Sequence, residues 1–185
     1  MKKKILITAA IIICLAILAT GTWAYFTSED KDTNVITAGN IDIDLIEMAK
    51  NENGKEVPFK DVSGVMPGSV VSKIVTVENT GDYDAFVRIG LAKDILLKGE
   101  GTEDLSLVTM DINTKDWTEK DGYYYYNSIL KPGEVTKPLF TEVSFSKHMD
   151  NKYQSATALI DVVAYAVQVA NNGTDPLTAL GWPAA

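Results

Sequence analysis

Apolar side chains recur at every second position over several short runs of this chain. In Asn40–Leu45 they alternate with Asp42 and Asp44, and Tyr83–Leu91 and Leu139–Phe145 show the same period. A period of two places one set of side chains on each face of an extended strand. The pattern therefore predicts an all-β fold.

Turn signals lie between these runs. Pro-Gly pairs at 67–68 and 132–133 each precede a β-branched or aromatic run, and we interpret them as two equivalent hairpin starts in one sandwich. Asp121-Gly122, inside the aromatic stretch 117–126, predicts a tight hairpin. Several short strands separated by turns are typical of a β-sandwich or jelly roll.

The expected domain is a jelly-roll-like antiparallel β-sandwich over residues 40–170. The short turn at 80–82 predicts that the strands 70–79 and 83–91 are antiparallel neighbours. The longest apolar stretch of the domain, 157–169, is rich in Val, Ile and Tyr, which predicts a central strand covered on both faces. A helix is the alternative for this stretch, because it contains several alanines.

The first 24 residues have the organisation of a removable signal peptide, expected to form an N-terminal signal helix. Three lysines precede the apolar run Ile5–Ala19, and small residues follow at Thr22 and Ala24. This order of charge, apolar run and small residues predicts cleavage between Ala24 and Tyr25. Residues 25–39 then form a polar, flexible N-terminal segment.

Two other interpretations of the N-terminus were weighed. Residues 5–26 carry no charge and are long enough to span a bilayer as an uncleaved anchor. The densely apolar part is short, however, and small residues follow it at cleavage spacing, which favours removal. A lipoprotein signal is excluded because Ile13, not a small residue, precedes Cys14.

Net charge restricts the partners. The chain has a net charge of −8, and removal of the signal with its three lysines and no acidic residue leaves −11. Such a charge argues against nucleic acid and against anionic lipid, so contact with a membrane is expected only through the signal before cleavage. The one cysteine leaves with the signal, so neither a disulfide nor thiol chemistry is expected afterwards.

No catalytic motif is present, so no catalytic residue, metal ligand or cofactor is predicted and the chain is not expected to be an enzyme. His148 is the only histidine, and neither H-E-x-x-H, G-x-S-x-G nor a phosphate-binding glycine pattern occurs. Asp42 and Asp44 share a strand face, but no calcium loop surrounds them. They are interpreted as a solvated acidic face.

Three features remain to be placed in the fold. Arg88 is the only arginine and is expected to pair with a carboxylate. The tyrosine run 123–126 predicts two side chains toward the core and two toward water. The C-terminal tail, residues 171–185, has the character of a loop, and Trp182 is expected to fold back over the sandwich.

Blocks of the sequence resemble the TasA/camelysin family. The segment 21–27 (GTWAYFT) is similar to the export signal cut by the SipW-type signal peptidase. The blocks 38–43 (AGNIDI), 66–68 (MPG) with 75–81 (VTVENTG), 151–154 (NKYQ) and 164–168 (AYAVQ) resemble conserved blocks of that family, in the same order. The resemblance covers most of residues 20–170.

The resemblance implies a Gram-positive-type protein secreted to the extracellular matrix or cell surface, with a jelly-roll domain. Members of this family assemble into biofilm fibres when the processed N-terminal segment adds as a strand to the next subunit. Here the donor strand would run from Tyr25 to about Ile36, with Phe26 and Val35 among its apolar side chains. The implied partners are the chain itself or a related matrix subunit, and a SipW-type signal peptidase during export.

Two alternatives remain open. The camelysin branch of the family is described as a metallopeptidase, although this sequence offers no zinc motif. A monomeric surface-binding module is the other alternative.

Overall fold

The computed structural model describes residues 35–37, 41–60 and 66–183. The chain divides into two compact units, Met1–Asp32 and Thr33–Ala185, and only the second contains described residues. The predicted signal helix and its cleavage site therefore lie outside the described residues. Among the described residues there is no helix long and apolar enough to cross a membrane.

The described part of the chain is mostly β-structure, as the period of two predicts. Its strands are β1 (Val35–Thr37), β2 (Ile43–Lys50), β3 (Glu56–Pro58), β4 (Val70–Ser72), β5 (Ile74–Asn79), β6 (Ala85–Leu96), β7 (Val108–Met110), β8 (Trp117–Lys120), β9 (Tyr123–Tyr126), β10 (Glu142–Phe145) and β11 (Thr157–Gln168). Two single 3₁₀ turns, Leu105–Leu107 and Asn151–Tyr153, interrupt them.

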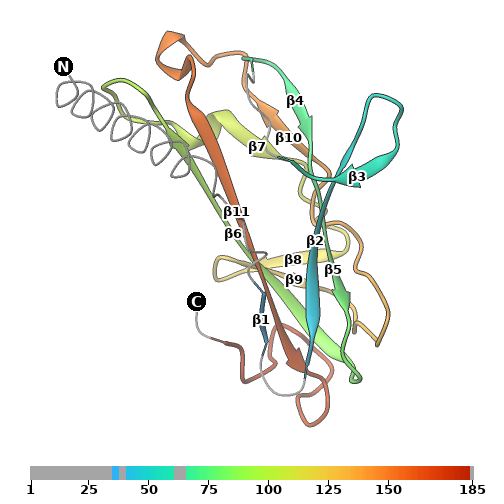
Figure 1. Cartoon of the computed structure of the whole chain (residues 1–185). Helices are drawn as coiled ribbons and strands as arrows, with labels where there is room; N and C mark the ends of the chain where they lie inside the picture. Colours follow the sequence, from blue (N-terminus) through green and yellow to red (C-terminus); the bar gives the residue numbers. More distant parts are fainter. Residues whose placement is uncertain (1–34, 38–40, 61–65, 184–185) are drawn as a thin grey trace, which may run out of the picture. The chain divides into compact units, whose positions relative to one another are not determined.

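A five-stranded sheet has the order β1-β11-β6-β9-β8. The two long strands β6 and β11 lie side by side along their whole length, antiparallel, from Ala85 opposite Gln168 to Leu96 opposite Thr157 (Figure 1). The apolar stretch 157–169 is therefore a strand rather than a helix. The predicted hairpin is confirmed as β8–β9, and its turn residues Asp121 and Gly122 both have positive φ, 53° and 81°.

Two three-stranded sheets, β4-β10-β7 and β3-β2-β5, account for the other strands. The segment 134–141 hydrogen-bonds along β5, through pairs such as Thr136 N to Val77 O at 2.9 Å and Leu139 N to Val75 O at 2.9 Å. This segment leads directly into β10, which pairs with β4. The run after the Pro-Gly pair at 67–68, which contains β4 and β5, therefore pairs with the run after the Pro-Gly pair at 132–133, which contains β10.

The expectation that the strands 70–79 and 83–91 are neighbours is wrong. The run 70–79 is divided into β4 and β5, and β5 pairs with β2, whereas β6 pairs with β11 and β9. The short turn between β5 and β6 crosses from one sheet to another. Its backbone hydrogen-bonds to the segment just before β2 rather than closing a hairpin. The nitrogens of Thr80 and Gly81 both donate to Asp42 O at 3.0 Å.

Residues from all three sheets share one buried apolar cluster. It contains Ile43 and Val77 from β2 and β5, Val87 and Ala164 from β6 and β11, and Val143 from β10. These side chains are at most 3% exposed. Along β6, Ala85, Val87 and Ile89 face this cluster while Phe86 lies in a different one, so the predicted alternation is confirmed.

The other face of β6 is covered by the C-terminal tail. Phe86, Val167 and Ala179 form a second buried cluster, against which Trp182 packs. The prediction that Trp182 folds back is therefore confirmed. The expectation for the tyrosine run needs correction, because the pair that does not face the main core meets the tail and Arg88 rather than open water.

Candidate functional site

The edge of the five-stranded sheet at β11 is built differently from the rest. Its last strand, β1, is only three residues long and runs parallel to β11, with Val35 opposite Ala164 and Thr37 opposite Ala166. The other strand pairs within this sheet are antiparallel. A parallel neighbour needs a crossover rather than a tight hairpin, so β1 is not held in place by a hairpin turn to β11.

On the β1 side, the strands of the described residues pair with only three positions of β11. On its β6 side all twelve residues of β11 are paired, but β1 covers only the positions 164–166. Within the described residues, no strand pairs with Thr157–Val163 on the β1 side. Unpaired N–H and C=O groups along a strand are a template for a further strand.

The sequence of β11 explains why this edge is ordered. Val162 and the four residues 164–167 are buried, so both faces of this half of the strand pack against other side chains. Asp161 is exposed, and a charged side chain on an edge strand discourages unspecific pairing. One half of β11 is therefore buried and pairs with β1, and no strand of the described residues pairs with the other half on that side.

Only some of the predicted site residues lie in the part of the chain that the structure describes. Val35 and Ile36, predicted as parts of the donor strand, lie in β1. Thr22, Ala24, Tyr25 and Phe26 lie outside the described residues, so the cleavage site and the start of the donor segment stay predictions. The sequence did not indicate that β1 pairs with β11, although the length of this strand and its small residues Ala164 and Ala166 are visible there.

Arg88 lies among aromatic rings rather than beside a carboxylate. Its guanidinium carbon is 3.9 Å from the centre of the Tyr123 ring, 4.8 Å from that of Trp182 and 5.1 Å from that of Tyr165. Nη1 donates to Tyr125 Oη at 3.2 Å, and Nη2 donates to Pro183 O at 2.9 Å. The predicted carboxylate pairing is therefore wrong for the described residues, in which aromatic faces and a backbone carbonyl take that place.

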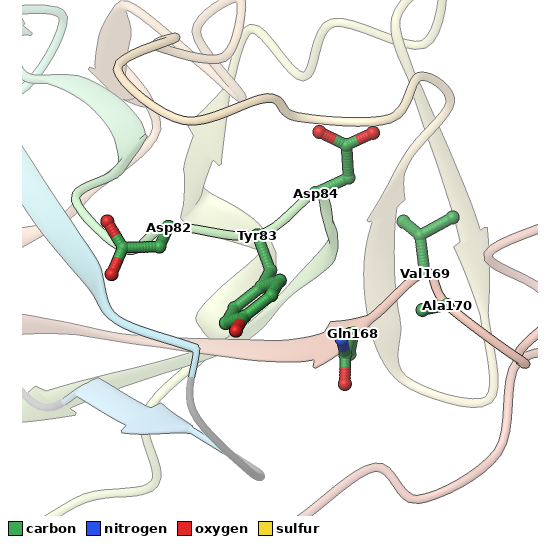
Figure 2. Close-up of a pocket in the computed structure, with 6 residues that line it drawn as sticks. All are labelled: Asp82, Tyr83, Asp84, Gln168, Val169 and Ala170. Carbon is green, nitrogen blue, oxygen red and sulfur yellow. The ribbon is translucent and has the colours of Figure 1, made fainter.

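A shallow hollow of about 390 Å³ lies where β6 begins and β11 ends. Its lining residues are Asp82, Tyr83, Asp84, Gln168, Val169 and Ala170. The Asp82 and Asp84 carboxylates point away from one another, and the Tyr83 ring does not point toward either of them (Figure 2). Two carboxylates that do not converge form neither a metal site nor an acid–base pair.

Displaced pKa values also lie outside this hollow. Burial raises the pKa of Tyr124, and the nearby charge of Glu119 adds to the effect. Hydrogen bonds from Ser106 hold the pKa of Asp104 below its usual value. Both arrangements are structural, since Tyr124 packs against the main core and Asp104 caps a 3₁₀ turn.

The fold and this edge define a mostly β protein whose first described strand is an edge strand of its main sheet. The chain belongs to the camelysin metallo-endopeptidase family, whose model matches residues 1–95, just over half of the 185 residues. The resemblance to the TasA/camelysin family is thereby confirmed. No match was found among curated proteins.

The family's description implies a metal ion, and the described residues do not fit one. His148 is exposed in the turn after β10, and its backbone nitrogen donates to Ser146 Oγ at 3.2 Å. Among the described residues, no three His, Cys, Asp or Glu side chains gather closely enough to hold a metal ion. A catalytic zinc needs three protein ligands, so we derive no metal-assisted step.

Proposed function

We propose that this chain is a secreted structural subunit of an extracellular or biofilm matrix, assembling head to tail by strand addition. The donor is the N-terminal segment from Tyr25 to about Ile36, freed by cleavage behind Ala24. The acceptor is the β1 side of β11. The supporting observation is that Val35–Thr37 already pairs with this edge, as a short parallel strand.

The pairing of β1 with β11 is short and therefore weak. Three residues of a parallel ladder provide few hydrogen bonds, each worth about 0.5–1.5 kcal/mol net. The same backbone bonds form whether the strand comes from the same chain or from another copy. Positions 157–163 adjoin the pairing at 164–166, and no described strand pairs with them on this side, so a longer incoming strand would gain contacts that Val35–Thr37 alone does not make.

Addition of one subunit's strand to the next subunit's edge is a heterologous contact. Each copy then offers a donor at one site and an acceptor at another, so the contact does not close and produces a filament. The proposal includes a jelly-roll-like sandwich, supported by the apolar cluster shared by the three sheets. It also includes export by a SipW-type signal peptidase, supported by the order of residues 1–25.

A surface metallopeptidase is the second candidate, favoured by the description of the family. It predicts hydrolysis that a chelator abolishes and that His148→Ala reduces. Activity that depends on neither would come from a contaminant. We propose the structural role instead, because the pairing of β1 with β11 supports strand addition, whereas no three potential metal ligands gather among the described residues.

The experiment compares protein starting at Tyr25 with protein lacking residues 25–36, by electron microscopy after concentration and mild acidification. Acidification reduces the repulsion caused by the net charge of −11 and should promote assembly. Filaments are expected only from the longer protein. Filaments from the shorter one would contradict the proposed donor.

A matched pair of point variants refines this comparison. Ile36→Pro removes a backbone donor from the strand and should stop assembly, whereas Ile36→Val keeps strand propensity and should not. If both variants assemble equally, the strand at 35–37 does not take part.

A further inference from the structure

The C-terminal tail makes a second docking arrangement, on a face of the main sheet. Ala179 is buried beside Phe86 and Val167, and the Trp182 ring meets the Tyr125 ring edge-on at 5.5 Å. The family match ends at residue 95, so this contact joins the matched part of the chain to a part beyond it.

The centre of the contact is the Arg88 cage, which we define as Arg88 with Tyr123, Tyr125 and Tyr165. Arg88 is 8% exposed, and its Nε is buried with no hydrogen-bond partner among the described residues. Burial of a guanidinium is costly unless its charge is compensated. In this cage the compensation comes partly from Trp182, whose ring faces the cation, and from the Pro183 carbonyl.

The tail has internal hydrogen bonds that keep it compact. Asn172 bonds Leu180 twice: its Nδ2 donates to the Leu180 carbonyl at 2.9 Å, and its Oδ1 accepts from the Leu180 amide at 2.7 Å. Asp175 accepts the Leu177 amide at 2.9 Å. A tail held compact by its own hydrogen bonds loses little conformational freedom when it docks, which lowers the entropic cost of binding.

The connection between β11 and the docked part of the tail is exposed. Ala170, Asn171, Gly173 and Thr174 all face solvent, and Asn171 has a positive φ of 62°. On the side of the tail, the Trp182 ring and the Pro183 carbonyl make the contacts with Arg88. None of them requires the tail and the cage to belong to one chain.

We propose that the Arg88 cage is an exchange site, at which Trp182 and Pro183 of a second copy of this chain replace the chain's own. Domain swapping of this kind creates no new contact and is governed by concentration. A short tether gives the chain's own tail an effective concentration of about millimolar, so exchange needs comparable local concentrations.

The place of the cage supports a second copy as the partner. Tyr165 stands in register with Arg88 on one side and with Ile36 on the other. The cage therefore belongs to the same row of the sheet as β1. Strand addition at the β11 edge would raise the local concentration of a second copy near the cage, although exchange itself does not require strand addition.

Complementation tests the proposal with full-length secreted chains, all carrying Ile36→Pro to prevent strand addition. Trp182→Ala leaves a vacant cage, and Arg88→Gln leaves a tail without a cage. Sedimentation velocity of the mixture should show a 1:1 complex that neither variant forms alone. The Trp182→Ala/Arg88→Gln double variant, mixed with either single variant, should not form it.

A mixture that sediments like its separate components would overturn the exchange. Because Arg88→Gln could impair folding, a second measurement uses only the Trp182→Ala chain. A labelled peptide of residues 171–183 should bind it, with anisotropy rising at submillimolar concentration, and the same peptide with alanine in place of the tryptophan should bind at least tenfold more weakly. Equal binding of both peptides, or of neither, would show that the cage does not recognise the tail.

Discussion

The amide nitrogen of Gly81 lies 3.0 Å from the carbonyl oxygen of Asp42. This bond joins the turn after β5 to the residue just before β2. It leaves no room for a side chain, because a Cβ atom at Gly81 would lie 2.8 Å from the Asp42 nitrogen. Two of the sequence blocks that resemble the family, 38–43 and 75–81, therefore meet at this point.

Gly81→Ala should lower the free energy of unfolding by about 2 kcal/mol, because the backbone of one of the two segments must shift. Urea denaturation measures the loss. Gly99→Ala is the matched control, since a Cβ there meets nothing within 4 Å. Equal stability of both variants would show that the close approach is relieved at no cost.

Asn79→Asp should destabilise the fold by about 3 kcal/mol at pH 8, because the buried amide donates to two carbonyls that would then face a carboxylate. The Asn79 Nδ2 atom lies 2.8 Å from Tyr83 O and 2.9 Å from Leu130 O. These carbonyls favour the protonated acid, so its folded-state pKa would rise and the loss should be smaller at pH 5. Denaturation at both pH values tests this, and an equal loss at both would contradict it.

Asp111→Asn should lower the melting temperature at neutral pH. Partial burial raises the pKa of Asp111, but hydrogen bonds from Thr141 Oγ1 and from the amides of Thr141 and Glu142 outweigh it and hold the pKa below the usual 3.8. A depressed pKa gives stability that is present above the unfolded-state value and is lost as the pH falls through the folded-state value. The difference between variant and parent should therefore shrink below pH 4, and a constant difference would contradict the role of the charge.

Glu47→Ala should cost more stability than the double change Glu47→Leu with Lys73→Met. Lys73 is 5% exposed, and its Nζ lies 2.7 Å from Glu47 Oε1 and 4.2 Å from the centre of the Phe59 ring. Removing one partner leaves a buried charge uncompensated, whereas replacing both removes the desolvation cost. Chemical denaturation of the parent protein, of Glu47→Ala and of the double variant gives their free energies of unfolding. A double variant less stable than Glu47→Ala would contradict the prediction.

Local pattern predicted the strands and several turns well. Alternation identified the two faces of β6, and Asp121-Gly122 identified the β8–β9 hairpin, because both signals lie within a few residues of the structure they specify. A period of two does not say which strand is the neighbour. The turn after β5 was therefore interpreted as a hairpin, although the bonds of Thr80 and Gly81 to Asp42 make it a crossing between sheets.

The candidate sites were harder to predict, because each depends on contacts far apart in the sequence. Arg88 and Pro183 are separated by 95 positions, and an aromatic environment gives no local signal comparable to a charge pattern. The resemblance to the family implied a donor strand, but it did not indicate that Val35–Thr37 pairs with β11. The register of β1 with β11 is what led us to propose β11 as the acceptor.

The most direct test of strand addition uses the absence of cysteine from the predicted secreted chain, since Cys14 lies in the signal. Val35 and Ala164 stand opposite each other, and neighbouring strands bring paired residues within the distance of a disulfide. Chains carrying Val35→Cys are mixed with chains carrying Ala164→Cys, assembled and oxidised, and the products are identified by mass spectrometry. Assembly by strand addition predicts a disulfide between the two different chains, at a higher yield in filaments than in dilute monomer. Filaments that contain no such mixed disulfide, while a chain carrying both substitutions closes within itself, would contradict the account.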